Sequence, residues 1–157
     1  MKKRLSYLLA AAGLLLGALP LQAQVATKPA ITLELAKKIA AKANAEAAQN
    51  NWKVVITIVD DGGQTVYIER MDGTQIGSID VSRAKALGAI KFKRPTKVFQ
   101  DLVSGGNTGL LALPGIIPNE GGLPLMVNGT AIGSIGISGA TSAQDGQIAA
   151  AGVTAMP

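Results

Sequence analysis

The sequence contains no cysteine and no histidine, and only 3% of its residues are aromatic. Without cysteine the chain forms no disulfide bond, so its stability has to come from packing or assembly. Without histidine it has no Ser-His-Asp triad, no imidazole general base and no histidine-ligated zinc site. Nucleic-acid-binding faces combine dense basic charge with aromatic side chains, and aromatics are scarce here. These absences exclude most familiar hydrolase chemistries and argue against a nucleic-acid partner.

Residues 1–23 have the pattern of a signal peptide. A basic start at Lys2–Arg4 precedes an uncharged, almost wholly apolar run from Leu8 to Leu19, and Ala23 supplies a small residue at the expected cleavage edge. The apolar run is about a dozen residues long, whereas a membrane-spanning helix needs about 20. We therefore expect cleavage before Gln24, no membrane span in the mature chain, and a periplasmic or secreted location.

The mature chain is predicted to be one domain preceded by a short arm. Residues 24–30 are polar, contain a proline and are predicted to be a flexible arm, and residues 31–157 are long enough for a single domain with its own core. The signal peptide carries three of the 15 basic residues and none of the 10 acidic ones, so the net charge falls from +5 to +2 on cleavage. The basic character of the whole sequence therefore comes largely from its export signal.

The order of the predicted elements indicates an α+β fold. Helices are predicted from apolar residues at i, i+4 spacing, and strands from β-branched or alternating segments bounded by glycine-rich turns. The predicted elements are helix 33–50, strand 53–59, strand 64–70, helix 78–91, a short helix from 96, a loop 104–114, strand 115–118, strand 122–127, strand 130–138 and a last helix from 142. This order predicts a mostly antiparallel sheet with helices packed against it.

Several polar residues are expected at helix starts, where a side-chain oxygen accepts a backbone N–H. Thr32, Ser78 and Thr96 are predicted to cap the first three helices. Ser142 and Asp145 are three apart and resemble a capping box for the last helix, so Asp145 is interpreted as a cap rather than a metal ligand or catalytic group.

Five segments, in this order, carry a family resemblance. They are Val59–Gly63, Glu69–Gly73, Ser82–Ala86, Gly121–Leu125 and Ile132–Gly139, the last followed by Gln144 and Asp145. Together they resemble the haem-binding family that includes a secreted redox-sensing haem-binding protein, the glycolate-utilisation operon G protein and the C-terminal domain of a propanediol-pathway cobalamin adenosyltransferase. The resemblance covers about residues 31–153.

The resemblance implies a profilin-like fold with a central antiparallel sheet, self-association into a homo-oligomer, and binding of haem or a related tetrapyrrole. This sequence departs from the family pattern after Lys85, where Gly88 stands in a stretch in which members commonly have a threonine. The absence of histidine also removes the commonest axial ligand of haem iron.

The same segments contain the candidate site residues. Arg70 and Lys85 are predicted to pair with propionate or other carboxylate groups in one pocket, with Asp72 orienting them; the alternative is a structural Arg-Asp turn plus a surface lysine. Tyr67 and Met71 are candidate haem ligands, because tyrosine and methionine can ligate haem iron, although methionine more often fills a core.

We therefore expect an exported haem- or tetrapyrrole-binding protein that acts in sequestration, delivery or redox sensing. One alternative is an enzyme with slow haem-degrading or small-carboxylate activity, and another is an oligomeric accessory protein without a small ligand. The binding protein is favoured over the enzyme, because the sequence offers no evident acid-base or nucleophilic set and no catalytic residue is predicted.

Overall fold

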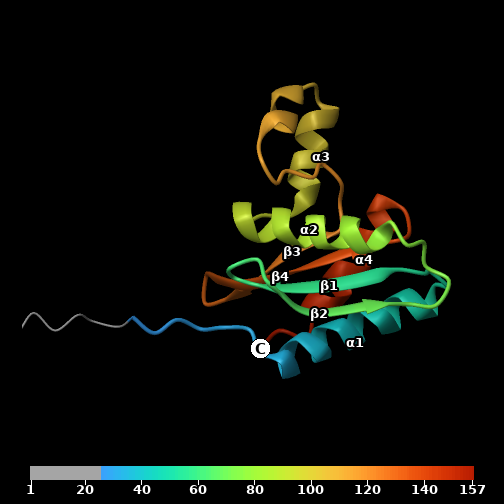
Figure 1. The fold of residues 1–157 in the computed structure, drawn as a ribbon, viewed down its shortest axis with the longest axis vertical. Coiled ribbons are helices and arrows are strands. Elements are labelled where there is room, and N and C mark those ends of the chain that lie inside the picture. The colour runs from blue at the N-terminus through green and yellow to red at the C-terminus, as the bar shows by residue number, and fades with distance from the viewer. Residues whose placement is uncertain (1–25) are drawn as a thin grey trace, which may run out of the picture.

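The computed structural model describes residues 26–157 (Figure 1). The predicted signal peptide and the first two residues of the predicted arm lie outside the described residues. Residues 26–30 are exposed and belong to no helix or strand, and Lys28 forms an ion pair with Asp61. Among the helices of residues 26–157, none has both the length and the apolar character needed to span a membrane.

Four strands form one antiparallel sheet in the order β2-β1-β4-β3. The elements are α1 (Leu33–Gln49), β1 (Val55–Asp60), β2 (Thr65–Arg70), α2 (Ser78–Phe92), α3 (Thr96–Ser104), the 3-10 helix η1 (Thr108–Ala112), β3 (Gly122–Val127), β4 (Thr130–Ser138) and α4 (Ser142–Val153). The predicted α+β fold with a central antiparallel sheet and packed helices is confirmed.

The strand predicted at residues 115–118 is wrong, and the loop predicted at 104–114 contains η1. Gly115 adopts a positive φ of 87° in a turn that the N–H of Ile116 closes on the carbonyl of Leu113. Pro118 then lacks the N–H that a strand ladder requires. The segment connects η1 to β3 without pairing to the sheet.

Two of the predicted helix starts can be compared directly with the capping hydrogen bonds. Thr32 caps α1 as predicted. The capping box of α4 is formed by Thr141 and Gln144, so the predicted box of Ser142 and Asp145 is wrong by one residue at each position. The shift matters because it leaves the Asp145 carboxylate available for another partner.

Ser78 and Thr96 are the first helical residues of α2 and α3 rather than their caps, which corrects both predictions. The caps are Gly77 and Pro95, and neither makes a side-chain capping bond. Both predicted caps are buried. The Oγ1 of Thr96 accepts the N–H of Gly122, 2.9 Å away, so this side chain connects α3 to β3.

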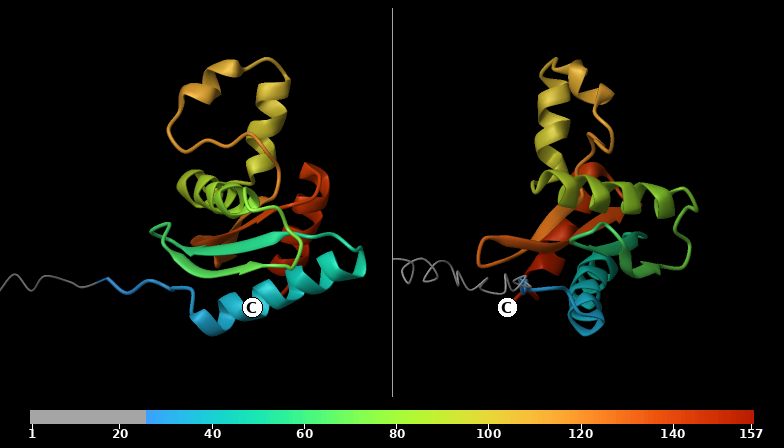
Figure 2. Two further views of the ribbon diagram at one scale, coloured as in Figure 1. Left: turned by 45° about the vertical axis from the view of Figure 1, so that its right-hand side comes forward. Right: turned by 60° about the vertical axis from the view of Figure 1, so that its left-hand side comes forward.

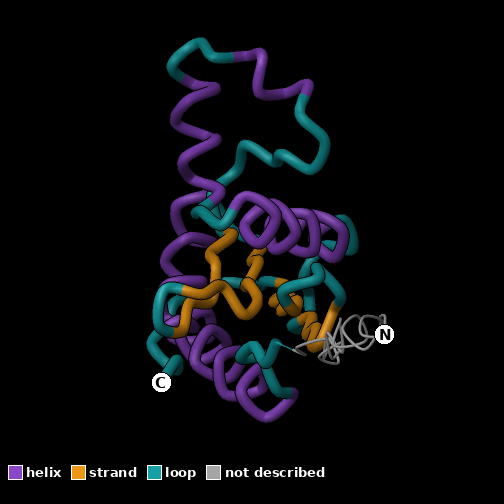
Figure 3. Tube along the Cα trace, turned by 90° about the vertical axis from the view of Figure 1, so that its left-hand side faces the viewer, coloured by secondary structure: helices purple, strands orange, loops and turns teal. Residues whose placement is uncertain are grey.

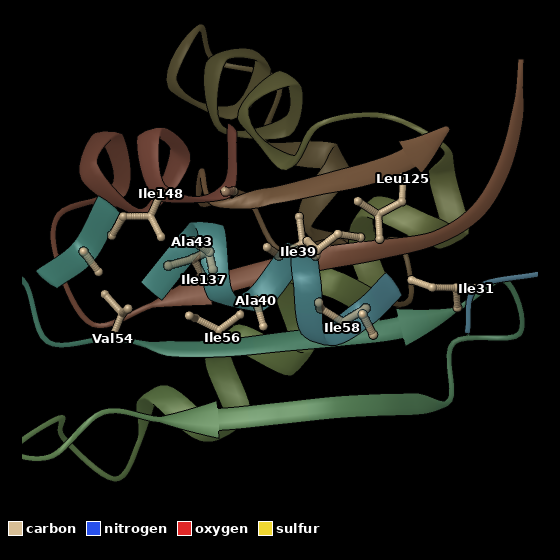
Figure 4. Close-up of a cluster of buried hydrophobic side chains, with 14 of the residues drawn as sticks. Ile31, Ile39, Ala40, Ala43, Val54, Ile56, Ile58, Leu125, Ile137 and Ile148 are labelled. Carbon is tan, nitrogen blue, oxygen red and sulfur yellow. The ribbon is translucent and has the colours of Figure 1, made fainter. Parts of the chain in front are cut away.

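The main apolar core lies between the sheet and the helices α1 and α4, which pack on the same face (Figures 2 and 4). Helix α1 contributes mostly alanine, and small side chains allow the helix to lie close to the strands. The buried core residues drawn in Figure 4 include Ile39, Ala43, Ile56, Ile58, Ile137 and Ile148.

Helix α2 covers the opposite face and packs on β1, β3 and β4. Beside a small apolar cluster of Val59, Ala86 and Ile90, this interface contains buried polar side chains. Thr57 and Ser82 share a hydrogen bond of 2.8 Å between their hydroxyls, and Ser134 donates to the carbonyl of Ala86 at 2.6 Å. A Cβ at Gly136 would lie 2.0 Å from the carbonyl oxygen of Ser82. The backbone of α2 therefore lies against the backbone of β4.

A projecting segment, residues 96–117, contains α3 and η1 and stands away from the sheet (Figure 3). Its base is fixed by Phe99, which is buried and packs edge to face on Phe92 with ring centroids 5.2 Å apart. The projecting segment exposes several large apolar side chains, namely Val98, Leu102, Leu111 and Leu113.

Candidate functional site

A buried ion pair joins α2 to α4 where β3 begins. Lys85, in the middle of α2, and Asp145, in the first turn of α4, are 2.7 Å apart between Nζ and Oδ2, and their side chains are 1% and 3% exposed. The second oxygen of Asp145 accepts the N–H of Ala140 at 3.1 Å. Both charged groups are therefore partnered, as buried ions have to be.

Two consecutive glycines close this ion pair off from solvent. A Cβ at Gly121 would lie 2.8 Å from the carbonyl oxygen of Ile137 and 3.1 Å from the Nζ of Lys85. A Cβ at Gly122 would lie 2.4 Å from the carbonyl oxygen of Lys85. Only residues without a side chain fit here, so the start of β3 lies directly over the lysine.

Burial acts against both charges of the pair. It lowers the pKa of Lys85, and the hydrogen bond and charge of Asp145 oppose that shift. It raises the pKa of Asp145, and the hydrogen bond and charge of Lys85 oppose that shift. Each group favours the ionised form of the other, so removing either partner leaves a buried group without its counter-charge.

A second polar cluster lies between β2 and α1. The hydroxyl of Tyr67 donates to Glu69 at 2.9 Å, and Asn44 of α1 also donates to Glu69. Their antiparallel partners on β1, Ile58 and Ile56, belong to the α1 core, so these side chains face α1. The hydrogen bond to the Glu69 carboxylate raises the pKa of the Tyr67 phenol, with burial acting in the same direction.

The other face of β2 is left open by α2, which packs on the remaining three strands. Ile68 and Arg70 lie on this face, opposite Thr57 and Val55 of β1. Ile68 is 44% exposed and Arg70 is exposed. Among residues 26–157, Arg70 makes no ion pair within 4.0 Å. A cation beside an exposed apolar side chain on a strand surface suits an amphipathic anionic ligand.

The structure does not bring the five predicted site residues together. Arg70 lies at the β2 edge of the sheet, and exposed Asp72 follows in the next turn, whereas Lys85 lies beside β3 at the opposite edge. Tyr67 points to the α1 side, and half-buried Met71 packs against the main core. The single pocket predicted from Arg70, Asp72 and Lys85 is thus not formed by these side chains, and Lys85 is not a surface lysine either.

The acidic residues of the described chain do not form a metal site. No group of three or more Asp, Glu, His or Cys side chains within residues 26–157 is arranged to hold a metal ion. Asp60 instead accepts the N–H groups of Gly62 and Gln64 at 2.9 and 2.8 Å. These hydrogen bonds close the hairpin turn between β1 and β2.

These features define a small α+β sheet domain with a buried lysine-aspartate connection and an open strand face. The chain belongs to the HbpS-like family: the model described as haem degrading protein HbpS-like matches residues 31–154. The predicted family resemblance is therefore confirmed, and it extends over nearly all of the described residues.

Individual relatives agree with this assignment. Protein GlcG of Escherichia coli (strain K12) is 37% identical over 112 residues, which is 71% of this chain and 84% of GlcG. The PduOC structure solved as a haem complex matches with a TM-score of 0.75 and 29% identity, over 82% of this chain and 96% of that one. A double mutant of Streptomyces reticuli HbpS matches with a TM-score of 0.78 and 29% identity, over 89% and 98%.

Proposed function

We propose that this chain is an exported protein that binds haem or a related tetrapyrrole non-covalently, in sequestration, delivery or redox sensing. The observation that carries the proposal is the family match over residues 31–154, joined to a shared fold with PduOC, which was solved with haem bound. Export is proposed from the signal-like sequence of residues 1–23. Self-association is proposed from the same family relationship.

The side chains of this protein suit a haem that is held by its propionates and its apolar ring better than a haem that is held by an axial side-chain ligand to the iron. With no histidine or cysteine in the sequence, the remaining ligand types near the family segments are tyrosine and methionine. The Tyr67 hydroxyl donates a hydrogen bond to Glu69, and Met71 packs against the core. Arg70 and Ile68 are the groups that would hold a haem, through a propionate and the ring edge respectively. The iron of a bound haem would supply the redox chemistry.

Substituting Arg70 tests this arrangement. An Arg70→Ala variant is expected to bind haemin about tenfold more weakly, because a charge-assisted hydrogen bond to a carboxylate is lost. The measurement is a titration followed by the Soret band. Lys42→Ala is the matched control, since Lys42 is an exposed cation on α1, away from the open face of β2. Equal weakening in both variants, or no weakening in either, would place the anionic groups elsewhere.

A Tyr67→Phe variant is expected to keep the Soret maximum of the wild-type complex. The phenol is hydrogen-bonded to Glu69 and its pKa is raised, so a phenolate ligand is disfavoured at neutral pH. The absorption spectrum of the haemin complex provides the readout. A displaced Soret band in Tyr67→Phe, with an unchanged band in Met71→Leu, would identify Tyr67 as the iron ligand and contradict the expectation.

The family description favours a second function, oxidative breakdown of haem. The chain then acts as the scaffold that holds haem while a reductant and oxygen supply the electrons and the oxidant. Time-dependent loss of the Soret band on adding a reductant to the complex supports breakdown, whereas a stable band supports binding alone.

A further inference from the structure

The side of α2 that faces β2 carries an exposed arginine, Arg83. A Cβ at Gly63, in the turn between β1 and β2, would lie 2.8 Å from the Cδ2 of Leu87, so Leu87 faces that turn. Arg83 lies one helical turn before Leu87 and therefore on the same side of the helix. The opposite side of α2 faces β3, where Lys85 lies beneath Gly122. These two cations of α2 therefore point towards different edges of the sheet.

The register of the sheet places Arg83 level with Ile68, the exposed apolar residue of β2. Ile68 is paired with Thr57 of β1, and the Thr57 hydroxyl is 2.8 Å from that of Ser82, the residue before Arg83. Arg70 lies two residues further along β2, on the same face as Ile68. An exposed apolar side chain is thus flanked by one arginine from the strand and one from the helix.

Neither arginine forms an ion pair within the described chain. No carboxylate of residues 26–157 lies within 4.0 Å of the charged groups of Arg70 and Arg83. This includes Asp72 and Asp80, the exposed acidic residues that lie near them in the sequence. A guanidinium presents its N–H donors in a planar fork that matches a carboxylate. The two arginines are therefore available to bind two carboxylates of a ligand.

We infer that Arg70 and Arg83 form a carboxylate clamp, which holds a tetrapyrrole by its two propionates without a bond to the iron. Each guanidinium pairs with one propionate, and Ile68 contacts the apolar ring. Two cations beside an apolar residue complement a flat apolar molecule with two carboxylates. The sequence has no histidine or cysteine to bind the iron, so an iron-free tetrapyrrole dicarboxylic acid belongs to the same ligand class as haem. The inference rests on the proposed function and names what the site recognises.

Protoporphyrin without iron separates the contribution of the carboxylates from that of the metal. Wild type is expected to bind it within about threefold of its affinity for haemin, because both molecules carry the same ring and the same two propionates. The fluorescence of protoporphyrin measures one affinity and the Soret band of haemin the other, in the same dilute detergent.

The dimethyl ester of protoporphyrin removes both carboxylate charges and keeps the ring. Wild type is expected to bind the ester about a hundredfold more weakly than the diacid, about tenfold for each lost charge-assisted hydrogen bond. Arg83→Ala is expected to bind the diacid about tenfold more weakly than wild type does, and the ester equally well. Arg94→Ala is the matched control, because Arg94 lies beyond the far end of α2, over the ring of Phe99, and should leave both affinities unchanged.

Circular dichroism confirms that the variants fold. The inference is overturned if Arg83→Ala binds the diacid as wild type does, if it loses the diacid and the ester equally, or if Arg94→Ala has the same effect. Protoporphyrin that binds more than about tenfold more weakly than haemin also overturns it, because the iron then contributes to binding. These outcomes leave haemin binding by wild type, and hence the proposed function, intact. Wild type that binds neither haemin nor protoporphyrin contradicts both the clamp and the proposed function.

Discussion

A Lys85→Met variant is expected to lose about 3–5 kcal/mol of unfolding free energy at neutral pH, which is the usual effect of breaking a buried ion pair from one side. Asp145 would keep its carboxylate in a site where its side chain is 3% exposed, with one backbone N–H from Ala140 but no cation. The Met side chain fills the volume of the lysine stem, so the loss reports on charge rather than on a cavity. Urea unfolding followed by circular dichroism measures it.

The deficit of Lys85→Met is expected to shrink in acid. Burial already raises the pKa of Asp145 above its ordinary value of 3.8, and Lys85 opposes that shift, so removing the lysine raises the pKa further. A group whose pKa is raised in the folded state contributes stability below its unfolded pKa, and that contribution is lost as the pH rises through the folded pKa. The gap between variant and wild type should therefore be smaller at about pH 4 than at about pH 7.

Two further variants separate charge from packing. The double variant Lys85→Met with Asp145→Leu should recover much of the lost stability, because an apolar pair replaces an uncompensated charge. Lys42→Met, which alters an exposed lysine on α1, should change the unfolding free energy little. A deficit that is the same at both pH values, and that the double variant does not reduce, would mean that Asp145 is not a buried unpaired charge in the single variant.

The parts of the fold that follow from local chemistry were predictable from the sequence. Thr32 caps its helix because it directly precedes an apolar periodic segment. The hairpin at Asn128 and Gly129 forms because both residues adopt positive φ, 47° and 77°, as the turn requires. The turn at residues 60–63 has a different basis: only Gly63 adopts a positive φ, 80°, and the Asp60 carboxylate accepts the N–H groups of Gly62 and Gln64.

The burial of Lys85 was not predicted, because it depends on segments distant in sequence. Helix α2 buries Ser78, Ser82, Lys85 and Ala89 along one stripe, and a lysine on a stripe of small residues was the signal available. The stripe alone does not identify the counter-charge, since Asp145 equally suited a helix cap. Only the approach of Gly121 and Gly122 encloses the lysine, and a one-residue shift of the cap leaves Asp145 to pair with it.

A Gly136→Ala variant is expected to lose about 3 kcal/mol of unfolding free energy, the upper part of the usual range for overpacking. The added Cβ would lie 2.0 Å from the carbonyl oxygen of Ser82 and 2.5 Å from the backbone nitrogen of Ala86. Backbone atoms in a helix cannot turn aside as a side chain can, so α2 has to move away from β4. That movement stretches the hydrogen bonds that Ser82 and Ala86 make to Thr57 and Ser134.

The control for Gly136→Ala is Gly77→Ala, because a Cβ at Gly77 meets no atom within 4 Å and its φ of −61° is open to any residue. This control should stay within about 0.5 kcal/mol of wild type. If both variants unfold at the wild-type urea midpoint, the close contact of α2 with β4 is not a constraint on the fold. A loss confined to Gly136→Ala instead means that the position of α2, and with it the position of Lys85 against Asp145, is set by the missing side chain on β4.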